Sequence, residues 1–180
     1  MKTLKNAGVV VLVLVAALAA AAWWYGMFRP VVVVEQQVGP LTLVYVEQTG
    51  SYAQTPRTMR AVDADLRARE VGPLRGYGLF RDNPREVPTA QLRAEVGAVI
   101  ADSDRRRLKD PSGRLKVRTL KRGPCLVAEI PFRGMPSIYV GIIRVYPALT
   151  AALRGHAGAA PYIIELYDRG KTITYLIPLR

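Results

Sequence analysis

The chain has 180 residues, a net charge of +12, one histidine and one cysteine. The single Cys125 excludes an internal disulfide framework, and one histidine with one cysteine cannot build a transition-metal cluster or a Ser-His-Asp or Cys-His catalytic arrangement. We therefore expect no metal and no cofactor, and the sequence also lacks a Walker motif and a G-x-G-x-x-G motif.

The first element along the chain is an uncharged apolar run at 7–28. A helix of this length rises roughly 33 Å, which is enough to cross the hydrocarbon core of a bilayer. Its far end carries Trp-Trp-Tyr at 23–25, and such amphipathic rings favour the level of the lipid headgroups. We predict that residues 1–29 form a membrane anchor that crosses the bilayer through residues 7–28.

The distribution of charge predicts the direction of this helix. Lys2 and Lys5 precede it and only Arg29 follows closely, so the positive-inside rule puts the N-terminus in the cytoplasm and residues 30–180 outside. A cleaved signal peptide is the alternative, because the alanines at 19–22 offer a small-residue cleavage site. The apolar stretch continues past these alanines to Phe28, which favours an uncleaved anchor.

Residues 30–180 predict one α+β domain in which the order strand, helix, strand, strand occurs twice. The expected strands are 41–46, 76–81, 95–100, 116–120, 125–132, 162–167 and 172–179, and the expected helices are 55–69 and 137–153. Tyr139, Ile143, Tyr146 and Leu153 would form the apolar stripe of the second helix. Two βαββ units can share one antiparallel sheet, with two helices on one face and a groove between the halves.

Lysine and arginine crowd the segment between Arg105 and Arg122, where Asp110 is the only acid. The turn sequence Asp-Pro-Ser-Gly at 110–113 divides the segment, so its charges flank a connection instead of lining a helix. A solvated linker is one interpretation, and contact with anionic lipid headgroups is the other. We expect no nucleic-acid partner, because the domain is expected outside the cell and the segment has no base-stacking aromatic residue.

Several short motifs, taken in order, resemble the GyrI-like small-molecule-binding domain, also known as the effector-binding domain of AraC- and MerR-type regulators. They are Gly-Leu-Phe-Arg-Asp-Asn-Pro at 78–84, Val-Pro at 87–88, Leu-Arg at 92–93, the helix after Gly134, Glu-Leu-Tyr at 165–167 and Ile-Pro-Leu at 177–179. The resemblance implies a duplicated βαββ fold, similar to that of SOUL proteins, with a ligand groove between its halves. The regulators carry a helix-turn-helix that this chain lacks, so direct control of transcription is not expected.

Glu165 is the main candidate for a site residue. Strand alternation puts Ile163, Glu165 and Tyr167 on one face, where a carboxylate among apolar neighbours must reach water or carry a large cost of burial. The resemblance implies that this glutamate holds the ligand. The alternative is that Glu165 hydrogen-bonds a neighbouring tyrosine or arginine and only orients the sheet. Glu129 is a weaker candidate, and the tyrosines that could line the groove are Tyr45, Tyr77, Tyr139, Tyr146 and Tyr167.

These residues predict a membrane-tethered domain that binds a cationic or amphipathic hydrophobic ligand in a groove with Glu165. The alternative is a hydrolase of reactive small molecules, as in one branch of the family, with Glu165 as general base and Tyr139 or Tyr167 as proton donor. Nothing in the chain demands catalysis, so no residue is assigned a catalytic role. Haem binding is not favoured, because His156 lies in the predicted loop Gly-His-Ala-Gly.

Overall fold

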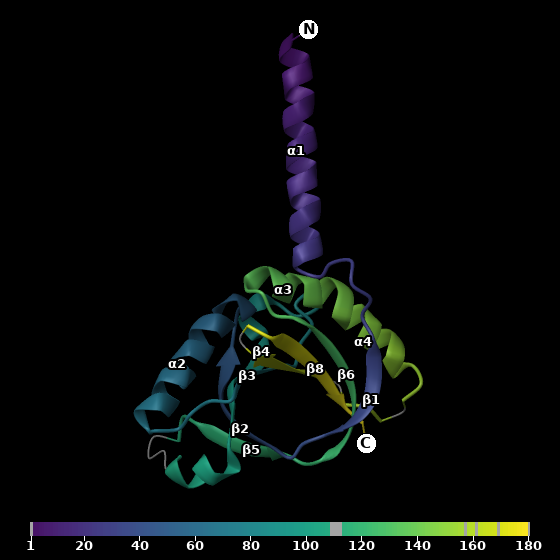
Figure 1. The fold of residues 1–180 in the computed structure, drawn as a ribbon. Coiled ribbons are helices and arrows are strands. Elements are labelled where there is room, and N and C mark those ends of the chain that lie inside the picture. Colours follow the sequence, from purple (N-terminus) through teal and green to yellow (C-terminus); the bar gives the residue numbers. More distant parts are fainter. Residues whose placement is uncertain (1, 109–112, 157, 161, 169, 180) are drawn as a thin grey trace.

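In the computed structural model, eight strands form one antiparallel sheet that curls around its own apolar face, and helices cover the outside of the curl (Figure 1). The structure describes residues 2–108, 113–156, 158–160, 162–168 and 170–179. The strands are β1 (Val33–Val38), β2 (Leu41–Thr49), β3 (Arg75–Phe80), β4 (Arg93–Ile100), β5 (Lys116–Leu120), β6 (Gly123–Pro131), β7 (Ile163–Asp168) and β8 (Thr172–Pro178). The predicted α+β class is confirmed.

The order of the strands shows how the two βαββ segments share this sheet. The order is β1-β6-β8-β7-β3-β4-β2-β5, and neighbouring strands are antiparallel throughout. Strands β2, β3 and β4 occupy one half and β6, β7 and β8 the other. Strands β3 and β7 pair at the middle, with Gly78 opposite Glu165. This order agrees with the two predicted units, while their origin by duplication stays a prediction.

The curl brings the two ends of the sheet together at one corner. Strand β1 leads through residues 39–40 directly into β2, yet β1 pairs with β6 and β2 pairs with β5. Gly39 has a φ of +95°, and a Cβ there would lie 3.1 Å from the carbonyl oxygens of both Leu120 and Lys121. A glycine therefore permits the close approach of the two turns. The inside of the curl is packed by Leu43, Tyr77, Leu79, Val99, Cys125, Val127, Ile164, Leu166 and Leu176.

Helix α2 (Thr55–Ala68) covers the half of the sheet formed by β2 and β4. Pro56 lies in its first turn, where the missing N–H costs nothing, and Arg67 lies in its last turn. Val62 and Leu66 are buried one turn apart against Val44 and Ala98 of the sheet. The helix predicted at 55–69 is thus confirmed, because its apolar residues recur at the spacing that a sheet-covering helix needs.

The second helical segment contains an unpredicted turn. It consists of α3 (Met135–Val140), a π-helical turn (Gly141–Val145) and α4 (Tyr146–Leu153). The apolar side chains that it buries most deeply are Val140, Val145 and Leu149, whereas Tyr139 and Ile143 are 62% and 58% exposed. The predicted stripe is therefore wrong for Tyr139 and Ile143, whereas Tyr146 and Leu153 pack against the core. Since the π-turn adds one residue to a turn, the buried face passes from Val140 to a residue five positions later.

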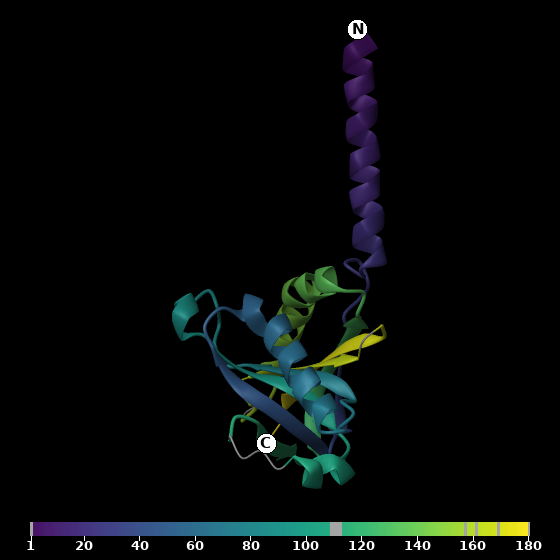
Figure 2. The ribbon, with the colours of Figure 1, turned by 90° about the vertical axis from the view of Figure 1, so that its left-hand side faces the viewer.

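Helix α1 (Lys2–Trp24) projects away from the domain in both views (Figures 1 and 2). Within the described residues, Gly8–Trp24 is an apolar helix, and Met135–Leu153 is the one helix long and apolar enough by length and composition to cross a membrane. The Met135–Leu153 segment, however, packs on the sheet through Val140, Val145 and Leu149. It is therefore a covering helix of the domain.

Parts of two predicted turns lie outside the described residues. Residues 110–112 belong to the turn expected at 110–113, and Arg169 belongs to the hairpin expected at 168–171. Three short 3-10 helices, at Tyr52–Gln54, Thr89–Gln91 and Asp102–Arg107, are additions to the prediction. His156 is half-buried just after α4, with its Nδ1 3.1 Å from the Ala152 carbonyl oxygen.

Candidate functional site

Glu165 lies at the middle of β7 and points toward the helical layer, on the same face as Tyr167. Only 3% of the residue is exposed. Its Oε1 accepts a hydrogen bond from the Tyr146 hydroxyl at 2.6 Å, and its Oε2 accepts one from the Tyr167 hydroxyl. Both carboxylate oxygens thus have donors, as burial of a carboxylate requires.

Burial controls the acidity of this cluster. It raises the pKa of Glu165 above its ordinary value, and the two tyrosine hydrogen bonds, which favour the charged carboxylate, oppose that rise. Burial also raises the pKa values of Tyr146 and Tyr167, and the nearby Glu165 charge raises them further. The tyrosines therefore stay protonated as hydrogen-bond donors, and Glu165 is the group of the cluster whose charge can change.

The π-turn shapes the helical side of the cluster. Tyr146 begins α4 directly after the π-turn, and its ring meets that of Tyr175 edge-on, with centroids 6.0 Å apart. The Tyr175 hydroxyl is buried and has no hydrogen-bond partner among the described residues. A Cβ on Gly141 would lie 1.8 Å from that hydroxyl oxygen, so the absence of a side chain at Gly141 makes room for Tyr175.

A pocket of about 530 Å³ lies beside this cluster, between α2 and the start of α3. Its lining is formed by Thr55, Pro56, Met59, Arg60, Asp63, Arg67, Pro73, Leu74, Arg75, Gly76, Gly97, Ala98, Phe132, Gly134, Met135, Ile138, Tyr167 and Asp168. Tyr167 lines the pocket and its hydroxyl donates to Glu165, so Tyr167 connects the pocket with the buried carboxylate.

The absence of a side chain at Gly76 leaves room for the pocket, a feature that the sequence interpretation missed. A Cβ on Gly76 would lie 2.7 Å from the Met59 sulfur and 3.3 Å from Tyr167 Cβ, two residues of the pocket lining. The sequence signal was available, because Gly76 and Gly78 alternate within a predicted strand. Glycines in a strand mark places where another group approaches closely.

The structure brings together three of the predicted site residues, namely Glu165, Tyr146 and Tyr167. Tyr45 and Tyr77 lie on the inner face of the curl, with ring centroids 6.2 Å apart, and Tyr139 is exposed on the outside of α3. These three residues do not contact the Glu165 carboxylate in this structure. Glu129 is exposed and accepts a hydrogen bond of 2.7 Å from the Thr174 hydroxyl.

A second buried carboxylate, Glu95, forms a separate cluster on the inner face of the sheet. The Tyr77 hydroxyl donates to its Oε2 at 2.9 Å, the Arg118 guanidinium lies 2.9 Å from the same oxygen, and Arg81 binds Oε1. Two guanidinium groups balance this charge, whereas the donors to Glu165 among the described residues are both tyrosines. Sequence reasoning missed Glu95, whose burial depends on strand pairings that bring β4 against β3.

Among the described residues, no group of three or more His, Cys, Asp or Glu side chains could hold a metal ion. The chemistry that the helical-side cluster offers is therefore that of one uncompensated carboxylate, its tyrosine donors and an adjoining pocket of mixed lining. The pocket rim carries charges of both signs, and Asp63 of that rim is 3.3 Å from Arg67.

Comparison with known proteins gives a match over most of the chain. The profile of the GyrI-like small molecule binding domain matches residues 32–178. The testis-expressed protein 264 homolog of mouse is 25% identical over 150 residues, which cover 77% of this chain and 45% of that protein. The chain thus spans less than half the length of this curated relative.

Two solved structures share the fold. The EcmrR C-terminal domain superposes with a TM-score of 0.59 at 9% identity, covering 83% of this chain and 96% of that one. SAV2435 bound to tetraphenylphosphonium superposes with a TM-score of 0.52 at 17% identity, covering 83% and 94%. At these identities the likeness concerns the arrangement of the elements.

Proposed function

The chain belongs to the GyrI-like small-molecule-binding domain family, and from that premise we propose that it binds a hydrophobic cation in the pocket beside Tyr167. Glu165 supplies the negative charge that selects the cation, and Tyr167, which donates to Glu165, contacts the cation in the pocket. The domain works while tethered to a membrane by α1. The family membership supports small-molecule binding, and the charge of the ligand is inferred from the site.

The observation that carries the proposal is the double role of Tyr167. Tyr167 lines the pocket, and its hydroxyl donates to a carboxylate that no cation neutralises among the described contacts. A phenol that donates to a carboxylate gains electron density, so the face of its ring attracts a cation more strongly. The apolar side chains of Met59, Phe132 and Ile138 would hold the hydrophobic part of the ligand.

The size of the pocket and one structural neighbour also support the proposal. A volume of about 530 Å³ falls within the range usual for small-molecule sites. SAV2435, which shares the fold, was solved with tetraphenylphosphonium, a cation surrounded by aromatic rings. The charged rim of the pocket is exposed to solvent, where salt screens it, while the Glu165 carboxylate is buried.

Tethering is supported by the form of helix α1. It extends away from the domain without packing along it, and its exposed side chains from Val9 to Leu18 are apolar (Figures 1 and 2). Such a surface is unfavourable in water and favourable in hydrocarbon. The charge asymmetry around the helix supports a domain outside the cytoplasm, and that orientation remains part of the proposal.

Binding of tetraphenylphosphonium tests the proposed function directly. Titration calorimetry should show saturable binding to the full chain in detergent, and Glu165→Gln should weaken it by about tenfold, or about 1.4 kcal/mol. Glu129→Gln is the matched control, because it removes the same charge from an exposed position on the other face and should leave the affinity unchanged. The neutral analogue triphenylphosphine oxide should bind wild type and Glu165→Gln equally.

Equal affinity of Glu165→Gln and wild type for the cation would remove Glu165 from the site. A cation that binds no better than its neutral analogue would show that the pocket selects shape without charge.

A further inference from the structure

The α3 segment, by which we mean α3 and the π-turn after it (residues 135–145), exposes large apolar side chains on its outer face that the domain does not cover. Met135, Tyr139, Ile142 and Ile143 are 52%, 62%, 48% and 58% exposed. The opposite side of the same segment is packed on the sheet, so the helix presents an apolar surface in two directions. A helix that only covers a sheet carries polar residues on its outer side, and an exposed apolar patch indicates a contact surface.

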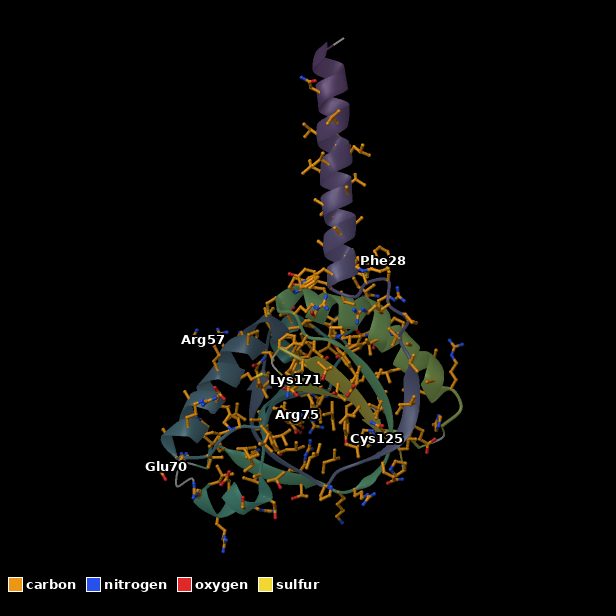
Figure 3. All side chains as sticks on the ribbon, viewed as in Figure 1. Phe28, Arg57, Glu70, Arg75, Cys125 and Lys171 are labelled. Atoms are coloured by element: carbon orange, nitrogen blue, oxygen red, sulfur yellow. The ribbon has the colours of Figure 1, made fainter. Side chains whose placement is uncertain are left out.

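This apolar face lies beside the base of α1. Figures 1 and 2 show α3 at the end of the domain from which α1 projects, and in Figure 2 it lies to one side of the base of α1. At that base Trp23, Trp24 and Phe28 are 72%, 61% and 59% exposed, and Figure 3 marks Phe28 at the junction. The two groups of apolar side chains therefore form one region on one end of the domain.

Two arginines fix the domain to the end of α1. The Arg133 guanidinium lies over the Trp24 ring, 4.1 Å from its centroid, and donates to the Trp24 carbonyl oxygen. Arg144 donates to the carbonyl oxygens of Met27 at 2.6 Å and Arg29 at 3.4 Å. Tyr25 and Met27 also pack against the helical-side core. These contacts set the direction of α1 relative to α3.

If α1 crosses a bilayer, this geometry puts the outer side of α3 at the level of the headgroups. A helix that crosses the base of a membrane span lies in the plane of the interface, as amphipathic interfacial helices do. The guanidinium groups of Arg133 and Arg144 contact carbonyl oxygens of residues 24–29 at the base of α1, and such groups suit lipid phosphates. By contrast, β5 and the 3-10 helix Asp102–Arg107 of the basic segment lie at the end of the domain away from α1 (Figures 1 and 2).

We propose that Met135, Tyr139, Ile142 and Ile143, together with Trp23, Trp24 and Phe28, form a lipid-facing surface that holds the domain against the bilayer. The inference rests on the proposed anchoring of α1 and goes beyond it, because anchoring by α1 does not by itself require any side chain of the domain to contact lipid. The apolar face of an interfacial helix is buried about 5–10 Å into the boundary between headgroups and acyl chains. The side chains of α3 are placed for that depth.

Spin labels on the full chain in phosphatidylcholine–phosphatidylglycerol vesicles test the proposal. Single cysteines replace Tyr139, Ile142 or Ile143 in a Cys125→Ala background, and Arg106→Cys, an exposed position in the distal 3-10 helix, is the control. We expect labels at 139, 142 and 143 to lose accessibility to a water-soluble nickel complex and to gain accessibility to oxygen. The label at 106 should remain fully accessible to the nickel complex.

Tryptophan fluorescence in the same vesicles separates the two proposals, because both tryptophans of the chain lie at the end of α1. Suppose that brominated lipids quench the tryptophans, but that the labels at 139, 142 and 143 are as accessible to water as the label at 106. This result would retain the anchor and overturn the lipid-facing surface. Absence of quenching would remove the anchor and, with it, this inference. Ile142→Glu with Ile143→Glu should release the remaining α3 label into water while the tryptophan quenching persists.

Discussion

Glu165 is buried next to three tyrosine rings and has two hydroxyl donors but no cationic partner among its described contacts. A carboxylate in such a place is costly to ionise, and its tyrosine donors offset only part of that cost. Glu95, on the other face of the sheet, has two guanidinium partners and needs no ligand for neutrality. Because the two buried acids differ in this way, a bound cation would neutralise the charge of Glu165, whereas the charge of Glu95 is already balanced.

The raised pKa of Glu165 predicts a particular dependence of stability on pH. Its ordinary pKa of 4.5 applies to the unfolded chain, and burial raises the folded value above it. Between the two values the folded protein holds the extra proton, so the free energy of unfolding falls as pH rises through that window. Glu165→Gln removes this titration. As the pH rises above 4.5, the free energy of unfolding of the variant should therefore increase relative to that of the wild type.

Urea unfolding of both proteins over a pH series measures this difference. Asp82 and Glu47, whose pKa values are lowered by Arg93 and Lys116 respectively, give the opposite slope at lower pH, but they are present in both proteins and cancel. Parallel curves for the two proteins would show that Glu165 titrates normally in the fold.

At the scale of elements, the π-turn of Gly141–Val145 determines what each part of the second helix contacts. Before it, Tyr139 points outward from the domain; after it, Tyr146 reaches Glu165. In a regular α-helix through 137–153, Tyr139 and Tyr146 would lie on the same face, because they are two turns apart. Such a helix could not point Tyr139 to solvent and Tyr146 to Glu165. The sequence held a signal for the irregularity, because Pro147 lacks the N–H that a continuous helix would use there.

The close contact between Gly141 and Tyr175 predicts a measurable coupling between these elements. Gly141→Ala should destabilise the domain by about 1–3 kcal/mol, because the new methyl group would overlap the Tyr175 hydroxyl. Tyr175→Phe removes a buried hydroxyl without a partner and should by itself be neutral or stabilising. Combining the two should recover part of the loss, since the oxygen is the nearest atom to the added methyl.

Gly155→Ala is the control for this prediction, because nothing lies within 4 Å of a Cβ at that position. Urea unfolding midpoints give the four free energies of the double-mutant cycle. Full additivity of the two substitutions would mean that the helix moves away from Tyr175 at little cost.

At the scale of the whole molecule, the hydrogen bonds and the cation–π contact between the domain and the N-terminal part of the described chain involve the end of α1 and the linker after it. They are made by Trp24, Met27 and Arg29. Cutting the chain after Trp24 removes the apolar helix and retains Tyr25 and Met27, which pack against the core. We predict that the full chain stays with membranes in alkaline carbonate extraction and that the truncated chain is released. The affinity of the truncated chain for tetraphenylphosphonium should match that of the full chain in detergent.

Release of the full chain by carbonate would contradict anchoring by α1. A truncated chain that is folded by circular dichroism yet fails to bind the cation would show that α1 contributes to the pocket itself.

Local patterns account for much of the fold. The strand β5 has the bounds predicted for it, and α2 differs by one residue from its prediction, because alternation and helical spacing are properties of neighbouring residues. The pairing of β1 with β6 and of β2 with β5 depends on contacts far apart in the chain, which such patterns do not contain. For the same reason Glu165 and Tyr167 were found together from the sequence, whereas the pocket beside Gly76 and the burial of Glu95 were not.

Met135 is both part of the pocket lining and part of the lipid-facing surface. If both proposals hold, the mouth of the pocket lies next to the acyl chains, and a hydrophobic cation would arrive from the lipid phase. Its effective concentration would then be set by its partition coefficient, so the same site would respond to far lower total amounts of ligand in a membrane than in free solution. Occupancy would follow lipid composition and surface charge as closely as it follows the residues of the pocket.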